Sequence, residues 1–302
     1  MTSQQTGPGP GGLPPSEQMR FQLLTGLPVT ERRLHLAGID TVVLEGGAGP
    51  SVVLLHGPAE YAAKWMRVFP ELVRTYHVIA PDLPGHGVSG AGGAPTAERM
   101  LGWLAELIGQ TCPSPPALVG HLLGGAIAAR FAAEHGDRIS HLVLVDSLGL
   151  APLQPTPEFG MALNEYLAGP TPDTHDKLWK LCAHDVDRVR EQMAQWDAFA
   201  AYNVDRARAT GSGEVLPALM GEFGMPAIPP ADLARIPAPT ALIWGRHDLA
   251  TRLSVAEEAS AAYGWPLHVI EDCADDPAVE QPEAFLRALH VALGRTVTRR
   301  QS

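Results

Sequence analysis

Cysteine is scarce in this chain of 302 residues. The three cysteines, Cys112, Cys182 and Cys273, lie far apart and form no C-x-x-C pair, so neither a disulfide framework nor a cysteine-based metal site is expected. The sequence also lacks a run of about 18 apolar residues and a basic N-terminal segment followed by an apolar one. These absences predict a cytoplasmic protein without a membrane span.

Basic residues are also few. Lysine and arginine total 22 against 33 aspartates and glutamates, which gives a formal net charge of −11. A surface of this charge repels nucleic acid and anionic membranes, and no basic or aromatic-rich cluster offsets the repulsion. The sequence contains neither a phosphate-binding loop nor a dinucleotide fingerprint. We therefore expect a small-molecule substrate as the partner and no cofactor, with the oligomeric state left open.

What the sequence does contain is an alternation of apolar, strand-like runs with helical patterns. The expected strands are Arg33–Leu36, Thr41–Leu44, Val52–Leu55, His77–Ala80, Ala117–Val119, Leu142–Val145, Pro237–Trp244 and Leu267–Ile270. Apolar residues at helical spacing mark Ala62–Tyr76, Ala97–Gly109, Ser254–Tyr263 and Glu280–Leu293. Strand, helix, strand is the repeating unit of a doubly wound α/β sheet.

Two segments depart from this alternation. Residues 1–27 are rich in proline and glycine and poor in apolar groups, which predicts a disordered tail. Residues 150–232 contain helix-like segments and prolines but no apolar strand run, which predicts an inserted helical cap. Residues 28–149 and 233–298 then form the α/β core.

The stretch Leu118–Ile127 reads L-V-G-H-L-L-G-G-A-I and predicts a strand that turns sharply into a helix. A nucleophile elbow has the pattern G-x-S-x-G, in which the glycines let strand and helix approach closely and the strained middle residue exposes its side chain above the sheet. This chain keeps Gly120 and Gly124 but has Leu122 in place of the serine. Leucine has no lone pair, so ordinary nucleophilic hydrolysis is not expected.

Four further motifs accompany the elbow in chain order. They are V-V-L-L-H-G at Val52–Gly57, P-D-L-P-G-H-G at Pro81–Gly87, L-I-W-G-R-H-D at Leu242–Asp248 and E-Q-P-E-A-F at Glu280–Phe285. On these motifs the chain, from about Arg32 to Leu293, resembles α/β-hydrolase-fold proteins and is similar to the capped carbon–carbon bond hydrolases, esterases and epoxide hydrolases. The resemblance implies an eight-stranded, mostly parallel sheet flanked by helices, with an inserted helical cap.

The resemblance also locates the expected catalytic positions. In the family a serine or aspartate on the elbow attacks, a histidine after the last strand moves protons, and a carboxylate after the preceding strand orients that histidine. The resemblance assigns the carboxylate to Asp248, but it puts Leu122 at the nucleophile position and Asp275 at the histidine position. It therefore implies a triad that has been dismantled.

The resemblance also implies an incomplete oxyanion hole. The family takes one donor from the backbone N–H of the residue after His-Gly, and here that residue is Pro58, which has no N–H. The N–H of Leu123 remains as the other donor. Loss of one such donor costs about 10²–10³ in rate where the donor is used.

Four polar residues are the catalytic candidates that remain. Asp248 and Asp275 are expected to lie close together, and because two neighbouring carboxylates do not easily both ionise, one keeps a proton near neutral pH. The alternative is that Asp275 turns to solvent or pairs with Arg246. Glu60 either faces the pocket or lies on a solvated loop, and His121 either takes part in catalysis or is a structural hydrogen-bond donor.

The substrate-binding candidates surround the elbow or lie on the cap. They are Pro58, Ala59, Tyr61, Leu122, Leu123, Leu148, Trp179, Trp196 and Tyr202. An apolar floor beneath aromatic side chains favours a bulky aromatic substrate, although the cap aromatics also fit a packed core. His175-Asp176 and His184-Asp185 are only weak metal signals, so no metal site is expected.

Three classes of function remain open. The first is a non-hydrolytic, cofactor-free enzyme that forms a carbon–carbon bond or closes a ring, as in members of this fold that serve polyketide and other specialised biosynthesis. There, rate comes from orientation and positioned acids and bases. The second is an inactive small-molecule binding protein, such as a receptor or carrier. The third is an atypical hydrolase that uses Asp275 or a bound water.

Overall fold

An eight-stranded sheet forms the centre of the molecule. In the computed structural model, which describes residues 14–93, 95–211 and 213–295, the strand order is β1-β2-β4-β3-β5-β6-β7-β8. The strands are β1 (Thr30–Leu36), β2 (Ile39–Gly46), β3 (Ser51–Leu55), β4 (His77–Pro81), β5 (Ala117–His121), β6 (His141–Val145), β7 (Thr240–Gly245) and β8 (Leu267–Ile270). Strand β2 pairs antiparallel with both β1 and β4, and the other pairs are parallel. The predicted mostly parallel sheet is confirmed.

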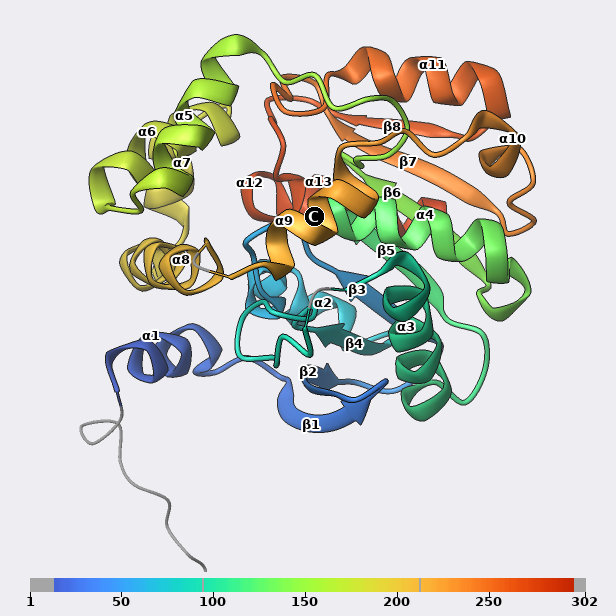
Figure 1. Ribbon diagram of the computed structural model, residues 1–302, viewed down its shortest axis with the longest axis horizontal. Coiled ribbons are helices and arrows are strands. Elements are labelled where there is room, and N and C mark those ends of the chain that lie inside the picture. Colours follow the sequence, from blue (N-terminus) through green and yellow to red (C-terminus); the bar gives the residue numbers. More distant parts are fainter. Residues whose placement is uncertain (1–13, 94, 212, 296–302) are drawn as a thin grey trace, which may run out of the picture.

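Helices cover both faces of this sheet (Figure 1). Successive strand residues point to opposite faces, so Val53 and Leu55 enter one apolar core and Val52 and Leu54 the other. The first core is closed by α3 (Ala97–Thr111), α4 (Leu123–His135) and α11 (Leu253–Tyr263). The second is closed by η2 (Ala62–Arg67), α2 (Phe69–Leu72) and α13 (Pro282–Ala292). A strand buried on both faces is mostly apolar, as β3 is after Ser51.

Two segments predicted as single helices differ from the helices observed. The segment Ala62–Tyr76 forms η2 and then α2, because Pro70 has no N–H to donate to the preceding turn. The segment Glu280–Leu293 forms α13 from Pro282 onward, and its first residue, Glu280, instead ends the separate short helix α12 (Pro277–Glu280). Gln281 precedes Pro282 and takes φ −131° and ψ 57°, since a residue before proline is held away from helical geometry.

A helical insertion, called the cap below, lies between β6 and β7. Its helices are α5 (Pro157–Ala168), α6 (Pro172–Cys182), α7 (Val186–Gln192), α8 (Trp196–Gly211), α9 (Val215–Leu219) and η4 (Met220–Gly224). Side chains of Thr156, Thr171 and Asp185 accept backbone N–H groups at the starts of α5, α6 and α7, as helix caps do. Figure 1 shows α5 to α8 gathered at one side of the sheet. Short helices η3 (Gly136–Arg138) and α10 (Pro230–Leu233) complete the fold.

The disordered tail predicted for residues 1–27 is corrected where the structure describes it. Residues 1–13 lie outside the described part, but Pro15–Leu24 form helix α1. Leu23 is fully buried, and Arg20 lies 3.1 Å from Glu31 and 3.4 Å from Asp82. The burial of Leu23 and the two ion pairs of Arg20 stabilise this helix, which the composition did not predict. None of the described helices is long and apolar enough to cross a membrane.

The turn between β5 and α4 depends on close contact between backbones. A Cβ on Gly124 would lie 2.4 Å from the carbonyl oxygen of Leu55 and 2.6 Å from that of His56. A Cβ on Gly120 would lie 2.3 Å from the carbonyl oxygen of Gly124. Backbone in a sheet and a helix start cannot give way, so glycine is required at both places.

We expect Gly124→Ala to destabilise the protein by about 3 kcal/mol, because the methyl group overlaps sheet backbone. Gly102→Ala is the matched control: Gly102 lies at an exposed position of helix α3 with nothing within 4 Å of an added Cβ, and the variant should gain about 0.5–1 kcal/mol. Urea unfolding of both variants measures the difference. Equal stabilities for the two variants would contradict the close-contact account.

Candidate functional site

Leu122 stands at the sharp turn from β5 into α4. Its backbone has φ 44° and ψ −110°, a strained conformation for a residue with a side chain. The turn is held because the Leu122 N–H donates to the Val145 carbonyl at 3.0 Å and the Leu122 carbonyl accepts from Leu148 at 3.1 Å. The structure thus has the geometry of a nucleophile elbow, but an isobutyl group projects from it.

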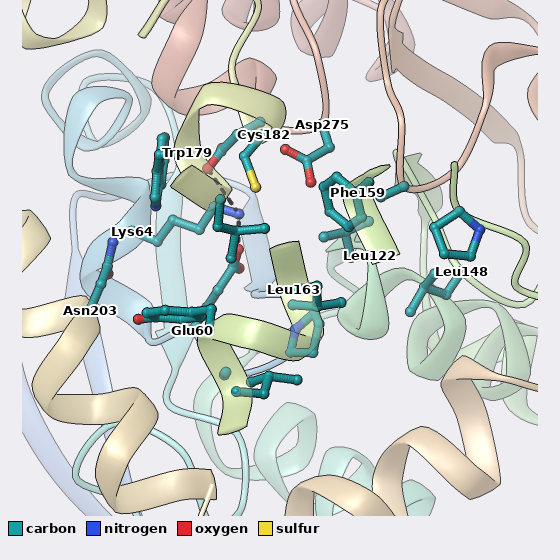
Figure 2. A pocket seen from close by; sticks show the side chains of 18 of the residues that line it. Glu60, Lys64, Leu122, Leu148, Phe159, Leu163, Trp179, Cys182, Asn203 and Asp275 are labelled. Carbon is teal, nitrogen blue, oxygen red and sulfur yellow. Dashed lines mark hydrogen bonds and ion pairs between the residues drawn. The ribbon is translucent and has the colours of Figure 1, made fainter. Parts of the chain in front are cut away.

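A pocket of about 150 Å³ opens between Leu122 and the cap. Apolar and aromatic side chains make most of its wall, and polar groups gather at one part of it. The lining residues are Pro58, Ala59, Glu60, Tyr61, Lys64, Leu122, Leu148, Leu153, Pro155, Phe159, Leu163, Tyr166, Leu167, Leu178, Trp179, Cys182, Phe199, Asn203, Met220, Ala250, Asp275 and Asp276. In Figure 2, Asp275 and Leu122 lie on one side, and Glu60, Lys64, Asn203 and Trp179 on the other. Among these residues there is no serine, threonine or histidine.

Eight of the residues predicted for the site line this pocket. They are Glu60, Asp275, Pro58, Ala59, Tyr61, Leu122, Leu148 and Trp179. The expectation that Glu60 lies on a solvated loop is wrong: its Oε2 accepts the Gly57 N–H at 2.6 Å beneath the pocket.

Five predicted residues do not line the pocket. Leu123 is fully buried in the first core, because the α4 helix turns it away from the mouth. Trp196 packs behind Trp179 with ring centroids 5.3 Å apart, and Tyr202 packs behind Tyr61 at 4.6 Å. These two cap aromatics support the wall from outside. Asp248 and His121, the other two, are described below.

Lys64 is the most consequential lining residue that the sequence did not reveal. It is buried on η2, and its Nζ contacts Glu60 Oε1, Asp276 Oδ2 at 3.2 Å and His121 Nδ1 at 2.6 Å. The i, i+4 spacing from Glu60 to Lys64 is a signal that could have found the pair. Asp276, Cys182 and Asn203 gave no comparable signal, because cap and loop placement bring them to the site.

His121 is a structural partner of this ion cluster. Its Nε2 lies 2.6 Å from the carbonyl oxygen of Asp275. A carbonyl only accepts, so Nε2 carries the proton and donates it. The other nitrogen, Nδ1, then accepts from the Lys64 ammonium. Of the two interpretations of His121, this geometry matches the structural one.

The charges in the cluster keep one another ionised. Burial alone would lower the pKa of Lys64, but the carboxylates of Asp276 and Glu60 raise it above its ordinary value. Burial alone would raise the pKa of Glu60, but the Lys64 ammonium holds it well below the ordinary value. Lys64 is therefore an ammonium and Glu60 a carboxylate at neutral pH.

Asp275 also faces the pocket, but its surroundings differ from those of Glu60 and Lys64. Its side chain is buried, and its backbone N–H donates to the carbonyl of Cys182 at 3.3 Å. Burial, together with the charges of Asp248 and Asp276, raises the pKa of Asp275 well above its ordinary value, which favours the neutral carboxylic acid over the carboxylate. The alternatives of exposure to solvent or pairing with Arg246 are wrong, because Arg246 pairs with Glu271 instead.

Asp248 lies beneath the site rather than in its wall. Its Oδ1 accepts the N–H groups of Ala250 at 2.7 Å and Thr251 at 2.9 Å, which closes the turn after β7. Burial raises the pKa of Asp248 to about 6. Burial and the neighbouring Asp248 also raise the pKa of Asp146 well above its ordinary value. The charge of Asp248 acts on Asp275 without a place in the pocket lining.

The pocket therefore offers acid–base groups, and no serine or threonine hydroxyl is among its lining residues. A neutral carboxylic acid both donates through its O–H and accepts through its other oxygen. The ammonium of Lys64 supplies a fixed positive charge where negative charge would develop on a substrate. Cys182 also lines the pocket, but burial raises the pKa of its thiol well above the ordinary value, so it stays protonated and unreactive.

Comparisons with known proteins place this geometry in a family. Residues 52–288 match the family described as "Alpha/beta hydrolase family". The chain is 28% identical to a pimeloyl-[acyl-carrier protein] methyl ester esterase of Aeromonas hydrophila, over 82% of this chain and 97% of that protein. It is 29% identical to a 2-hydroxymuconate semialdehyde hydrolase of Pseudomonas sp. (strain CF600), over 85% and 92%.

A solved structure gives the same result. The 2-hydroxy-6-oxo-6-phenylhexa-2,4-dienoate hydrolase of Rhodococcus sp. strain RHA1 superposes with a TM-score of 0.76 at 25% identity, covering 89% of this chain and 99% of that one. The relatives named here are thus esterases and carbon–carbon bond hydrolases. With a matching family description over most of its length, an elbow and a cap, the chain belongs to the alpha/beta hydrolase family.

Proposed function

We propose that this protein is a non-hydrolytic, cofactor-free enzyme that forms a carbon–carbon bond or closes a ring in a bulky, largely aromatic small molecule. The observation that carries the proposal is the pairing of Leu122 on the elbow with the buried acid of Asp275 in one pocket wall. At the elbow, Leu122 cannot attack a substrate, whereas the apolar wall can orient a ligand and Asp275 can move a proton.

The chemistry needs only Asp275 and the charge of Lys64. An enol carbon of the substrate attacks a carbonyl carbon, and the new carbon–carbon bond forms as the carbonyl π bond breaks. Asp275 gives its proton to the resulting oxygen and its other oxygen takes the proton from the enol O–H. One neutral carboxyl is thereby regenerated with no net gain or loss of protons.

The apolar wall supports the substrate class. Leu122, Phe159, Leu163 and Trp179 face the pocket together, and such surfaces bind flat, apolar ligands while a few polar groups fix their orientation. The names of two of the relatives given above specify unsaturated acids, one of which carries a phenyl group, as substrates. We extend that class, though not their reaction, to this pocket.

We expect the wild-type protein not to hydrolyse nitrophenyl acetate or butyrate above background, and Leu122→Ser not to create an esterase, because Asp275 replaces the base and Pro58 lacks the donor. Burst-phase absorbance at the nitrophenolate band measures both. Leu148→Ser, which adds a hydroxyl elsewhere in the lining, is the control. Hydrolysis by the wild type that disappears in Asp275→Asn would establish the atypical hydrolase instead.

We expect Asp275→Asn to reduce ring closure of aryl 1,3-diketone substrates by about 10²–10⁴, the loss typical of a general acid or base, while ligand affinity stays nearly unchanged. Product absorbance gives the rate, and quenching of the tryptophan fluorescence, to which the pocket residue Trp179 contributes, gives the affinity. Asp137→Asn, on an exposed residue of η3, should change neither. Tight binding without turnover of any such diketone by the wild type would favour the binding protein.

The protonated state of Asp275 has its own test in stability. A carboxyl with a raised folded pKa stabilises the fold fully below its unfolded pKa, and this contribution is lost as pH rises towards the folded pKa. Asparagine does not titrate, so the free energy of unfolding of Asp275→Asn relative to that of the wild type should rise between pH 4 and pH 7. Urea unfolding across this range measures it, with Asp137→Asn as control. A flat difference would mean that Asp275 is ionised in the folded protein.

A further inference from the structure

Two histidines and an aspartate from distant parts of the chain meet outside the pocket. The side chains of His184, His247 and Asp272 each bring a possible ligand atom within 4.8 Å of the other two. His184 Nε2 lies 4.0 Å from Asp272 Oδ1. The imidazoles of His184 and His247 are stacked, with ring centroids 4.3 Å apart and planes at 20°.

Backbone hydrogen bonds hold all three residues in place. The His184 N–H donates to Glu280 Oε2 at 2.6 Å, and the His247 N–H donates to the Cys273 carbonyl at 2.9 Å. The Asp272 carbonyl accepts from Gln281 at 2.9 Å. The three side chains thus extend from fixed backbone, so little order has to be created when they share a ligand.

The residues around the three side chains leave them available. The side chains of His184 and Asp272 are 38% and 68% exposed, so an ion reaches them from solvent. Asp185, which the sequence paired with His184, instead caps α7 through Arg188 N–H. Arg246 is engaged with Glu271, and Arg188 bonds only the backbone carbonyl of Asp272, at 3.4 Å.

We propose that His184, His247 and Asp272 bind a divalent transition-metal ion of the zinc class. Two neutral imidazoles and a carboxylate are a ligand set that suits such ions, with solvent completing the coordination. Small side-chain rotations bring the three atoms to the spacing that bonds of about 2.0–2.2 Å require. The site is separate from the pocket and does not depend on the proposed function.

The ion would join the cap to the sheet. His184 belongs to the loop between α6 and α7 in the cap, and His247 and Asp272 follow β7 and β8 of the sheet (Figure 1). Cys182 and Asp275, a few residues from these ligands, line the pocket and are already joined by a backbone hydrogen bond. Metal binding would therefore fasten the wall that carries Asp275.

The test uses full-length protein freed of any histidine tag and treated with chelator. Zn²⁺ alone is titrated in competition with a chromophoric chelator, and Co²⁺ absorbance reports coordination. We expect one equivalent of Zn²⁺ for the wild type, with affinity reduced at least about tenfold in His184→Ala, His247→Ala and Asp272→Asn. Zinc should also raise the Tm of the wild type by about 3 °C or more and leave that of His184→Ala/His247→Ala unchanged.

A matched control is available on β1. His35 Nδ1 lies 2.8 Å from Asp40 Oδ1 on the surface, a histidine–aspartate pair without a second imidazole, so His35→Ala should keep wild-type zinc binding. Equal binding by the wild type and the His184→Ala/His247→Ala variant would overturn the proposal, as would a loss in His35→Ala as large as in His247→Ala. Unchanged Tm values of the variants without metal show that folding is not the cause.

Discussion

The arrangement of the site depends on the buried ammonium of Lys64. A charge this deep is stable only with partners, and Lys64 has Glu60, Asp276 and His121 around its Nζ. These contacts fix η2, the loop after β3 and the loop after β8 against one another. Because His121 then donates to the Asp275 carbonyl, the same cluster also positions the backbone of the acid that faces the pocket.

The cluster gives the neighbouring acids Asp275 and Asp276 different surroundings. Asp276 contacts the ammonium directly, whereas Asp275 has burial and neighbouring negative charge around it. Burial raises the pKa of both acids, but for Asp276 the Lys64 ammonium opposes that rise directly. The pocket wall thus places the carboxyl of Asp275 near the ion pair of Lys64 and Glu60. Because these two charges are paired, they hinder the binding of an apolar ligand less than a lone charge would.

Local patterns were enough to predict the sheet, the elbow and several lining residues. Apolar runs located the eight strands, and G-H-L-L-G located the turn at Leu122 because glycine spacing reflects backbone contact within a few residues. The break between η2 and α2 near Pro70 and the start of α13 after Gln281 were missed, although prolines signalled both. Strand β7 begins at Thr240, after Pro239, rather than at Pro237.

Long-range placement was harder to predict. Lys64 looked like an ordinary helical lysine, and its burial depends on Asp276, over 200 residues later in the chain. Helix α1 depends in the same way on Glu31 and Asp82. Trp196 and Tyr202 had the right chemistry for a pocket, but which face of a cap helix meets the ligand is decided by packing.

The strained backbone of Leu122 divides the pocket into a fixed part and an adjustable part. Its turn is set by glycine contacts within the sheet, so the floor cannot move without disturbing the core. The opposite wall is made of cap side chains such as Phe159 and Leu163 on α5, outside the sheet. Changes in ligand preference are therefore accessible through α5, where substitutions reshape the cavity and leave the core of the sheet intact.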